Sequence, residues 1–144
     1  MSLHIVHFIG PINHNSACAV RNCCLQALQN GATEIELHLS TEGGNMTAGF
    51  ALYFFLKSLP LPLTTHNIGS VESVGVVIFL AGQKRYATIF LDATREAGHA
   101  TDIRANLTGK ARIFTAEEAV QAGIVHDAIQ ARLPGQGTTC HWWN

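Results

Sequence analysis

The chain has 144 residues, a formal net charge of -1, 13% charged residues and 47% hydrophobic residues. This length suits one domain that buries its apolar surface without disulfides or a structural metal. The mixed charges provide neither a basic stripe for nucleic acid nor a polybasic anchor for a membrane, so neither partner is expected. In typical soluble domains about a quarter of the residues are charged. The lower share of charged residues in this chain predicts that part of its surface is covered by other subunits of a homo-oligomer.

The opening segment, MSLHIVHFIGPINHN, has no basic region before its apolar run and no small-residue cleavage site. It therefore does not resemble a signal peptide, and we expect a cytoplasmic protein. The cysteines form no C-x-x-C pair and are interpreted as small hydrophobic residues. They are Cys18, Cys23, Cys24 and Cys140.

Short β-rich runs alternate with helical patterns along the first part of the chain. The expected strands cover 3–10, 34–40 and 63–69, and the expected helices cover 15–31, 45–60 and 73–82. Asn15 or Ser16 is the expected N-cap of the first helix. This alternation predicts βαβ units and a largely parallel sheet, with ligands beyond the carboxyl ends of the strands.

Two glycine-bearing turns lie at those carboxyl ends, on successive units. They are STEGGN, residues 40–45, and GSVESVG, residues 69–75. Because the ends of parallel strands share one edge of a sheet, the two turns are predicted to face one another. Ser73 in the second turn is either an N-cap that satisfies an orphan amide or a nucleophile held at a helix N-terminus.

The pattern becomes less regular after residue 83. QKRYAT begins as a strand, yet the helical pattern IFLDATREAG follows it without a turn, with Gly98 just past its end. A helix in TAEEAVQAG, with Thr115 as N-cap and Glu118 at the capping-box position, precedes a last strand in IVHDAI. We expect residues 134–144 to form a mobile tail.

Four segments of the sequence resemble the ClpP family, the proteolytic subunit of the ATP-dependent Clp protease. They are IVHFIGPIN, STEGGNMTAGFALYFFLKS, IGSVESVGVVIFLAGQKRYA and RIFTAEEAVQAGIVHDAI. The second is similar to the family's Pro-Gly-Gly loop, and the third is similar to its nucleophile turn. The resemblance implies an α/β fold of the ClpP/crotonase type, a spiral of ββα units with a mostly parallel sheet and surrounding helices. It implies a single domain over 1–133.

The resemblance also implies a serine endopeptidase. Ser73 takes the position of the nucleophile that forms an acyl-enzyme. Gly44 and Val74 take the positions whose backbone N–H groups bind the developing oxyanion. The implied substrate is a peptide or unfolded protein, and the implied assembly is a homo-oligomeric, heptameric ring with an AAA+ unfoldase partner. No metal and no cofactor are expected. The apolar helix FALYFFLKSL is expected to lie in the core or against neighbouring subunits, as is part of 15–30.

The chain departs from the family pattern at several positions. Glu42 replaces the proline before the two glycines and Glu72 replaces the alanine before the nucleophile, and we expect both carboxylates to be solvated. Ala111 stands where the family has an acidic residue. The Ile-His-Pro context of the family's general base is absent, as is most of its handle helix, between Thr88 and Ile89.

Two hypotheses address the missing base. In one, His99 takes this role. In the other, a segment near 88/89 that holds the base is deleted, or was disordered and left out of the sequence, which the abrupt change from strand to helix favours. The other histidines, including His38 and His66 in predicted strands, show no metal-ligand spacing and are interpreted as structural.

Two alternative functions stay open. LTGKARIFTAEEAVQAGIVHDAI also resembles the closing segment of crotonase-type enzymes that act on acyl-CoA thioesters. Such an enzyme does not need a serine at position 73. A catalytically inactive ring component is the other alternative, because Ala111 replaces the expected acid and the base is absent.

Overall fold

The computed structural model describes residues 2–88, 115–131 and 139–142. Its strands are β1 (Leu3–Ile9), β2 (Glu34–Thr41), β3 (Leu63–Val71), β4 (Lys84–Ala87), β5 (Asp127–Ala128) and β6 (Thr139–Trp142), and its helices are α1 (His14–Gln29), α2 (Met46–Lys57), α3 (Val74–Phe79) and α6 (Ala116–Gln121). The strands form one sheet in the order β5-β4-β3-β2-β1-β6, and every neighbouring pair is parallel. The predicted alternation of strands and helices, and the parallel sheet, are confirmed.

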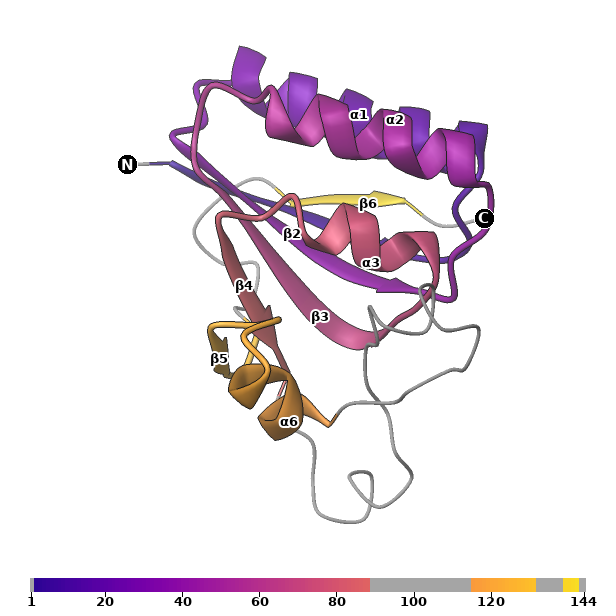
Figure 1. Ribbon diagram of the computed structural model, residues 1–144. Coiled ribbons are helices and arrows are strands. Elements are labelled where there is room, and N and C mark those ends of the chain that lie inside the picture. Colours follow the sequence, from indigo (N-terminus) through magenta and orange to yellow (C-terminus); the bar gives the residue numbers. More distant parts are fainter. Residues whose placement is uncertain (1, 89–114, 132–138, 143–144) are drawn as a thin grey trace.

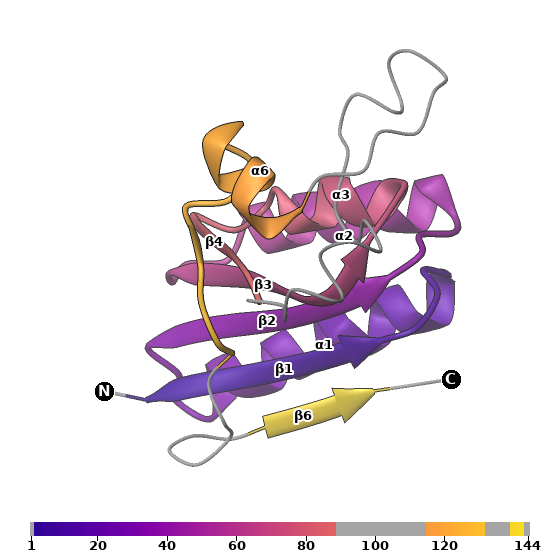
Figure 2. The same ribbon diagram turned by 90° about the horizontal axis from the view of Figure 1, so that it is seen from below.

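Helices α1, α2 and α3 cover one face of the sheet (Figure 1). The opposite face of β1, β2 and β3 is turned toward the viewer in Figure 2. Side chains alternate across a strand, and Ile35, Leu37 and Leu39 of β2 belong to the hydrophobic core with at most 1% of their surface exposed. The intervening Glu36 and His38 therefore lie on the face away from these helices. This face carries the second polar cluster described below.

Helix α1 begins earlier than the sequence predicted. Its N-cap is Asn13, and not Asn15 or Ser16. The Asn13 side chain accepts a hydrogen bond from the Ser16 backbone N–H at 2.8 Å, and the Ser16 hydroxyl accepts one from the Asn13 N–H at 2.9 Å. Ser16 is the third helical residue that closes this capping box. Of the cysteines in α1, Cys24 is buried and Cys18 is exposed.

The segment after residue 114 follows the predicted order with a shorter strand. Thr115 caps α6 as predicted, because its hydroxyl accepts a hydrogen bond from the Glu118 backbone N–H at 3.1 Å. In IVHDAI, only Asp127 and Ala128 form a strand, β5. Ile124 and Val125 are instead buried in the core.

Residues Thr139–Trp142 form β6, where the sequence predicted part of a mobile tail. They pair with β1 in register from Ile5 with Thr139 to Phe8 with Trp142. The physical reason is the free edge of β1, whose backbone N–H and C=O groups need partners. The expected helix in 89–98, the 88/89 junction, His99 and Ala111 lie outside the described residues. The domain boundary at 133 stays a prediction.

Candidate active site

The two glycine-bearing turns lie side by side at the carboxyl ends of β2 and β3, as predicted. Gly43 has a φ of +97°, and a Cβ atom built on it would lie 2.7 Å from Cβ and 3.2 Å from Oγ of Ser73. Any side chain at Gly43 would therefore collide with Ser73. The Ser73 side chain faces the Gly43-Gly44 loop, in the orientation that a nucleophile beside an oxyanion hole requires.

Ser73 has a strained backbone. Its φ of 53° and ψ of -131° make it the one non-glycine residue with positive φ in the described part of the chain. Such a conformation costs about 1–3 kcal/mol and is concentrated at functional sites. Ser73 stands at the N-cap position of α3, but its side chain makes no capping hydrogen bond and is exposed. The N-cap interpretation therefore does not explain the serine.

The Gly43-Gly44 loop is held against the segment that follows β1. The Ile12 N–H donates to the Gly43 carbonyl at 2.8 Å, and the Asn45 N–H donates to the Ile12 carbonyl at 2.8 Å. Gly44, between them, has a φ of +147°, and a Cβ atom on it would overlap the Ile12 carbonyl oxygen. Among the described residues, the N–H groups of Gly44 and Val74 have no hydrogen-bond partner. Both are free to donate to a ligand.

Val74 is fixed by packing between α3 and α2. Its side chain is 0% exposed, and a Cβ atom on Gly49 of α2 would overlap it. Helix α2 itself starts directly after the glycine loop, where the Asn45 side chain accepts a hydrogen bond from the Ala48 N–H at 2.8 Å. The same helix therefore positions the Gly44 amide at its start and the Val74 amide through Gly49.

Glu42 and Glu72, the two departures from the family pattern, are both exposed, as predicted. The Glu72 carboxylate accepts a hydrogen bond from the Ser70 hydroxyl at 2.9 Å. Water screens an exposed carboxylate, so its repulsion of a nearby oxyanion is weakened.

A cavity of about 450 Å³ opens beside the glycine loop, at the carboxyl ends of β1, β2 and β3. Its lining consists of Ile9, Gly10, Pro11, Ser40, Thr41, Glu42 and Ser70. Ser40 and Ser70 are joined, because the Ser70 N–H donates to the Ser40 hydroxyl at 3.2 Å. The volume lies within the range of ligand pockets, about 300–1,000 Å³. The position also fits the rule that ligands bind beyond the carboxyl ends of parallel strands.

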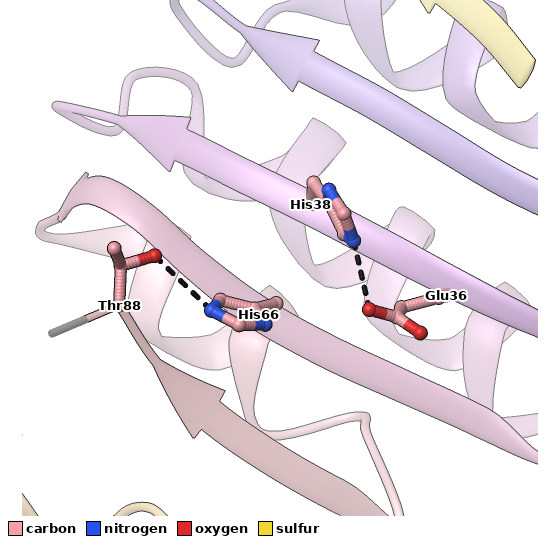
Figure 3. Close-up of polar contacts among 4 residues, drawn as sticks. All are labelled: Glu36, His38, His66 and Thr88. Atoms are coloured by element: carbon pink, nitrogen blue, oxygen red, sulfur yellow. Dashed lines mark hydrogen bonds and ion pairs between the residues drawn. The ribbon is translucent and has the colours of Figure 1, made fainter. Parts of the chain in front are cut away.

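A second polar cluster, which the sequence analysis missed, lies in the middle of the sheet. Glu36 and His38 extend from β2 and His66 from β3, on the same face (Figure 3). Nε2 of His38 lies 2.8 Å from Oε1 of Glu36, and Nε2 of His66 lies 3.1 Å from the Thr88 hydroxyl. The parallel register pairs His38 with His66. The sequence offered one signal for this cluster, which is the presence of a histidine in each of two successive predicted strands that could pair.

The cluster shifts the titration of one of its histidines. Burial, and after it the neighbouring His38, lowers the pKa of His66 from 6.5 to about 4, against the opposing effects of Glu36 and of a backbone hydrogen bond with Ile129. His66 is therefore neutral at physiological pH. In the described part of the chain, no histidine nitrogen forms a hydrogen bond with the Ser73 hydroxyl.

The fold is of the α/β, ClpP/crotonase type. ClpP1 from Listeria monocytogenes has a similar structure, with a TM-score of 0.70 and 21% sequence identity, over 89% of this chain and 92% of that chain. A mutant of the same protein gives a TM-score of 0.68 and 22% identity, with the same coverage. At this identity the likeness concerns the fold alone.

The family model for Clp protease matches residues 1–95, and the chain therefore belongs to the Clp protease family. The ATP-dependent Clp protease proteolytic subunit 1 of Corynebacterium jeikeium (strain K411) is 33% identical over 75 residues. That match covers 51% of this chain and 39% of the relative, so the chain spans less than half the length of this curated relative. In the described part of the chain, no helix has the length and apolar character needed to span a membrane.

Proposed function

We propose that this chain is a ClpP-like serine endopeptidase subunit that hydrolyses peptide bonds through an acyl-enzyme at Ser73. The observation that carries the proposal is the geometry of Ser73. Ser73 is an exposed residue in a strained turn, and its hydroxyl lies beside the Gly43-Gly44 loop. A serine that served only to cap α3 would need neither the strain nor this neighbour.

In the proposed reaction, Ser73 Oγ attacks the carbonyl carbon of the scissile peptide bond, and its proton passes to a general base. The N–H groups of Gly44 and Val74 bind the oxygen on which negative charge develops, and loss of one such donor costs about 10²–10³-fold in rate. Collapse of the tetrahedral intermediate releases the amine and leaves an ester on Ser73, which water hydrolyses. We assign the general base to none of the described residues.

The strand ends next to the Gly43-Gly44 loop support a peptide as substrate. The cavity there is lined in part by the segment Ser40–Glu42, while Ser73, Gly44 and Val74 lie outside its lining. The peptide substrate is proposed from the family and from this position at the strand ends, because the hydroxyls of Ser40, Thr41 and Ser70 already form hydrogen bonds within the chain.

Exposed apolar side chains on α2 support the proposed homo-oligomeric ring. Met46, Phe50 and Phe54 are 51%, 41% and 65% exposed. Their spacing of four residues places them on one side of the helix, and aromatic residues and methionine are enriched in subunit interfaces. The AAA+ unfoldase partner rests on the family resemblance. The cytoplasmic location predicted from the sequence is also part of the proposal.

A fluorophosphonate probe tests the proposed chemistry, because it reacts covalently with an activated serine. We expect the wild-type chain to be labelled at Ser73, as mapped by mass spectrometry, and Ser73→Ala to lose the label. The control is Ser58→Ala, which removes an exposed hydroxyl at the end of α2 that donates to the Phe55 carbonyl. It should be labelled like the wild type.

Two other results would overturn the proposal and favour an alternative. Saturable binding of an acyl-CoA, without probe labelling, would indicate a crotonase-type enzyme. A chain that forms rings but neither reacts with the probe nor cleaves a fluorogenic peptide would indicate a catalytically inactive ring component.

A further inference from the structure

We propose that Glu36, His38 and His66 form a binding site for a divalent transition-metal cation, with Zn²⁺ as the best fit. The site lies on the sheet face away from α1–α3 and is independent of the proposed peptidase chemistry. Two imidazoles and one carboxylate form a donor set that binds Zn²⁺ in proteins, with a fourth position left for water or another ligand.

The distances suit a metal after a small adjustment. One ligand atom from each of the three side chains lies within 4.8 Å of the other two. In a tetrahedral Zn²⁺ site, bonds of about 2.0–2.2 Å place neighbouring ligand atoms about 3.4 Å apart. Side-chain rotation over about 1–1.5 Å would close the cluster around the ion, while β2 and β3 stay in register.

The strongest single observation is an unpartnered nitrogen. His66 is 0% exposed, and its buried Nδ1 atom has no hydrogen-bond partner among the residues that the structure describes. A buried polar atom without a partner costs about 1–3 kcal/mol. Figure 3 shows this atom on the side of the ring opposite Thr88. A cation between Nδ1 and the two ligands on β2 would remove the cost.

Thr88 favours the tautomer that a metal needs. Its hydroxyl lies 3.1 Å from Nε2 of His66. If the Nε2–H group donates to this hydroxyl, Nδ1 carries the lone pair and can bind a metal. The other tautomer would leave a buried N–H donor unsatisfied. Metal-binding histidines commonly hold their second nitrogen by such a hydrogen bond, which fixes the ring orientation.

The electrostatics of the cluster also favour a cation. Glu36 is only 4% exposed, and its carboxylate brings negative charge into the sheet face, where a cation is stabilised more than in water. In the metal-free arrangement, the two proposed ligand atoms on β2, Glu36 Oε1 and His38 Nε2, are hydrogen-bonded to each other.

His4 supplies a matched comparison. It is 3% exposed and also has an unpartnered Nδ1 atom, but it belongs to no group of potential metal ligands in the described part of the chain. A buried histidine alone therefore does not define the site. The site is defined by the neighbouring donors on β2, Glu36 and His38.

Titration of the metal-free full chain with Co²⁺ and then Zn²⁺ tests the proposal. We expect one Co²⁺ per chain with the visible absorption of a tetrahedral complex, and its displacement by Zn²⁺. Glu36→Gln and His38→Gln should weaken Zn²⁺ affinity about 100-fold or more, because loss of a mere second-shell partner already costs about 10–100-fold. His4→Gln should bind Zn²⁺ like the wild type.

Wild-type binding that is absent, or equally tight in Glu36→Gln, would overturn the proposal. If the variants fail to fold, nitrogen NMR of the wild-type histidine rings decides. Zn²⁺ should shift the ring signals of His38 and His66 and leave His4 unchanged. Shifts confined to the exposed His14 and His126 would show adventitious surface binding and refute the site.

Discussion

The sheet carries polar groups in two regions that are built in opposite ways. At its carboxyl edge, Ser73 is exposed, has a strained backbone and stands in a turn beside a glycine loop. In its interior, His66 is fully buried in a regular strand, next to Glu36 and His38. The edge site offers backbone N–H groups and a hydroxyl, whereas the interior cluster offers imidazole nitrogens and a carboxylate.

The difference suits the two regions to the two kinds of chemistry that we propose for them. Turns at strand ends can adopt conformations that regular strands exclude, and they leave N–H groups free for a developing anion. Strand interiors fix side chains at spacings set by the register, which suits a cation that needs several donors at once. Each prediction below acts on one of the two regions.

The largest effect is expected for Gly44→Ala at the edge site. A Cβ atom there overlaps the Ile12 carbonyl, and the φ of +147° disfavours a side chain. Displacement of the Gly44 N–H should slow fluorophosphonate labelling by about 10²–10³-fold. The control is Gly31→Ala, at a φ of +79° with nothing near its Cβ position. It should lose only about 1–2 kcal/mol of stability and keep its labelling rate. Equal labelling in both variants would contradict the oxyanion role.

The next effect concerns His66 in the interior cluster and its pH dependence. The folded-state pKa of about 4 lies below the ordinary 6.5, so the unfolded chain binds more protons between these values. The stabilisation is therefore complete above pH 6.5 and is lost as the pH falls toward 4. The shift corresponds to about 3 kcal/mol. Glu36 and His38 of β2 and Tyr86 of β4 are the titratable groups around the ring.

Urea unfolding of the metal-free protein, with a chelator present, measures this dependence. His66→Gln should show a smaller loss of unfolding free energy between pH 6.5 and 4 than the wild type. His14→Gln, at the exposed first residue of α1, is the control and should keep the wild-type dependence. An unchanged dependence in His66→Gln would show that other groups cause it.

A smaller effect is expected for Gly49→Ala, which acts on the edge site through packing. The added methyl group overlaps Val74 and should cost about 1–3 kcal/mol. Because the Val74 N–H moves with α3, labelling at Ser73 should also slow, by about tenfold. Ala51→Gly, at an exposed position of the same helix, should cost about 1 kcal/mol without slowing the label. Parallel losses of labelling in both variants would indicate a general effect of stability.

The smallest effect is expected from a comparison of Ser73→Gly with Ser73→Ala, which measures the backbone strain at Ser73 independently of its reactivity. Ser73→Gly should raise the unfolding free energy above that of Ser73→Ala by about 1 kcal/mol, because glycine tolerates the φ of 53°. Both variants should lose the label. Thermal unfolding of the pair measures the difference. Equal stability would mean that the turn stores no strain.

The sequence predicted the edge site better than the interior cluster, for a physical reason. Ser73 and the Gly43-Gly44 loop follow two successive strands, and the ends of parallel strands meet wherever the sheet forms. Their proximity therefore depends little on register. The meeting of His38 with His66 depends on the alignment of β2 with β3, which a change of one residue would undo. No local pattern in EIELHLS or LTTHNIG specifies that alignment.

The fold itself was predictable where local patterns are strong. The strands and helices up to residue 88 follow their apolar periodicity and their Gly, Pro and Asn boundaries. The start of α1 was missed, because Asn13, Asn15 and Ser16 are all good caps and only the reciprocal bond of Asn13 with Ser16 distinguishes them. Strand β6 was missed because the residues around Thr139–Trp142 show no clear alternation of apolar and polar side chains. Its pairing also depends on β1, which is far from it in the sequence.

The pairing of β1 with β6 has a consequence for folding during synthesis. Among the described strands, β1 leaves the ribosome before the others, and Thr139–Trp142 leave it after them. Until then, one edge of β1 has no partner, while β2 can already occupy the other. An open strand edge can pair with another chain, so nascent chains on one messenger would be exposed to such pairing until β6 arrives. Pairing with β6 thus covers this edge of β1 and leaves the short strand β6 as the edge of the sheet.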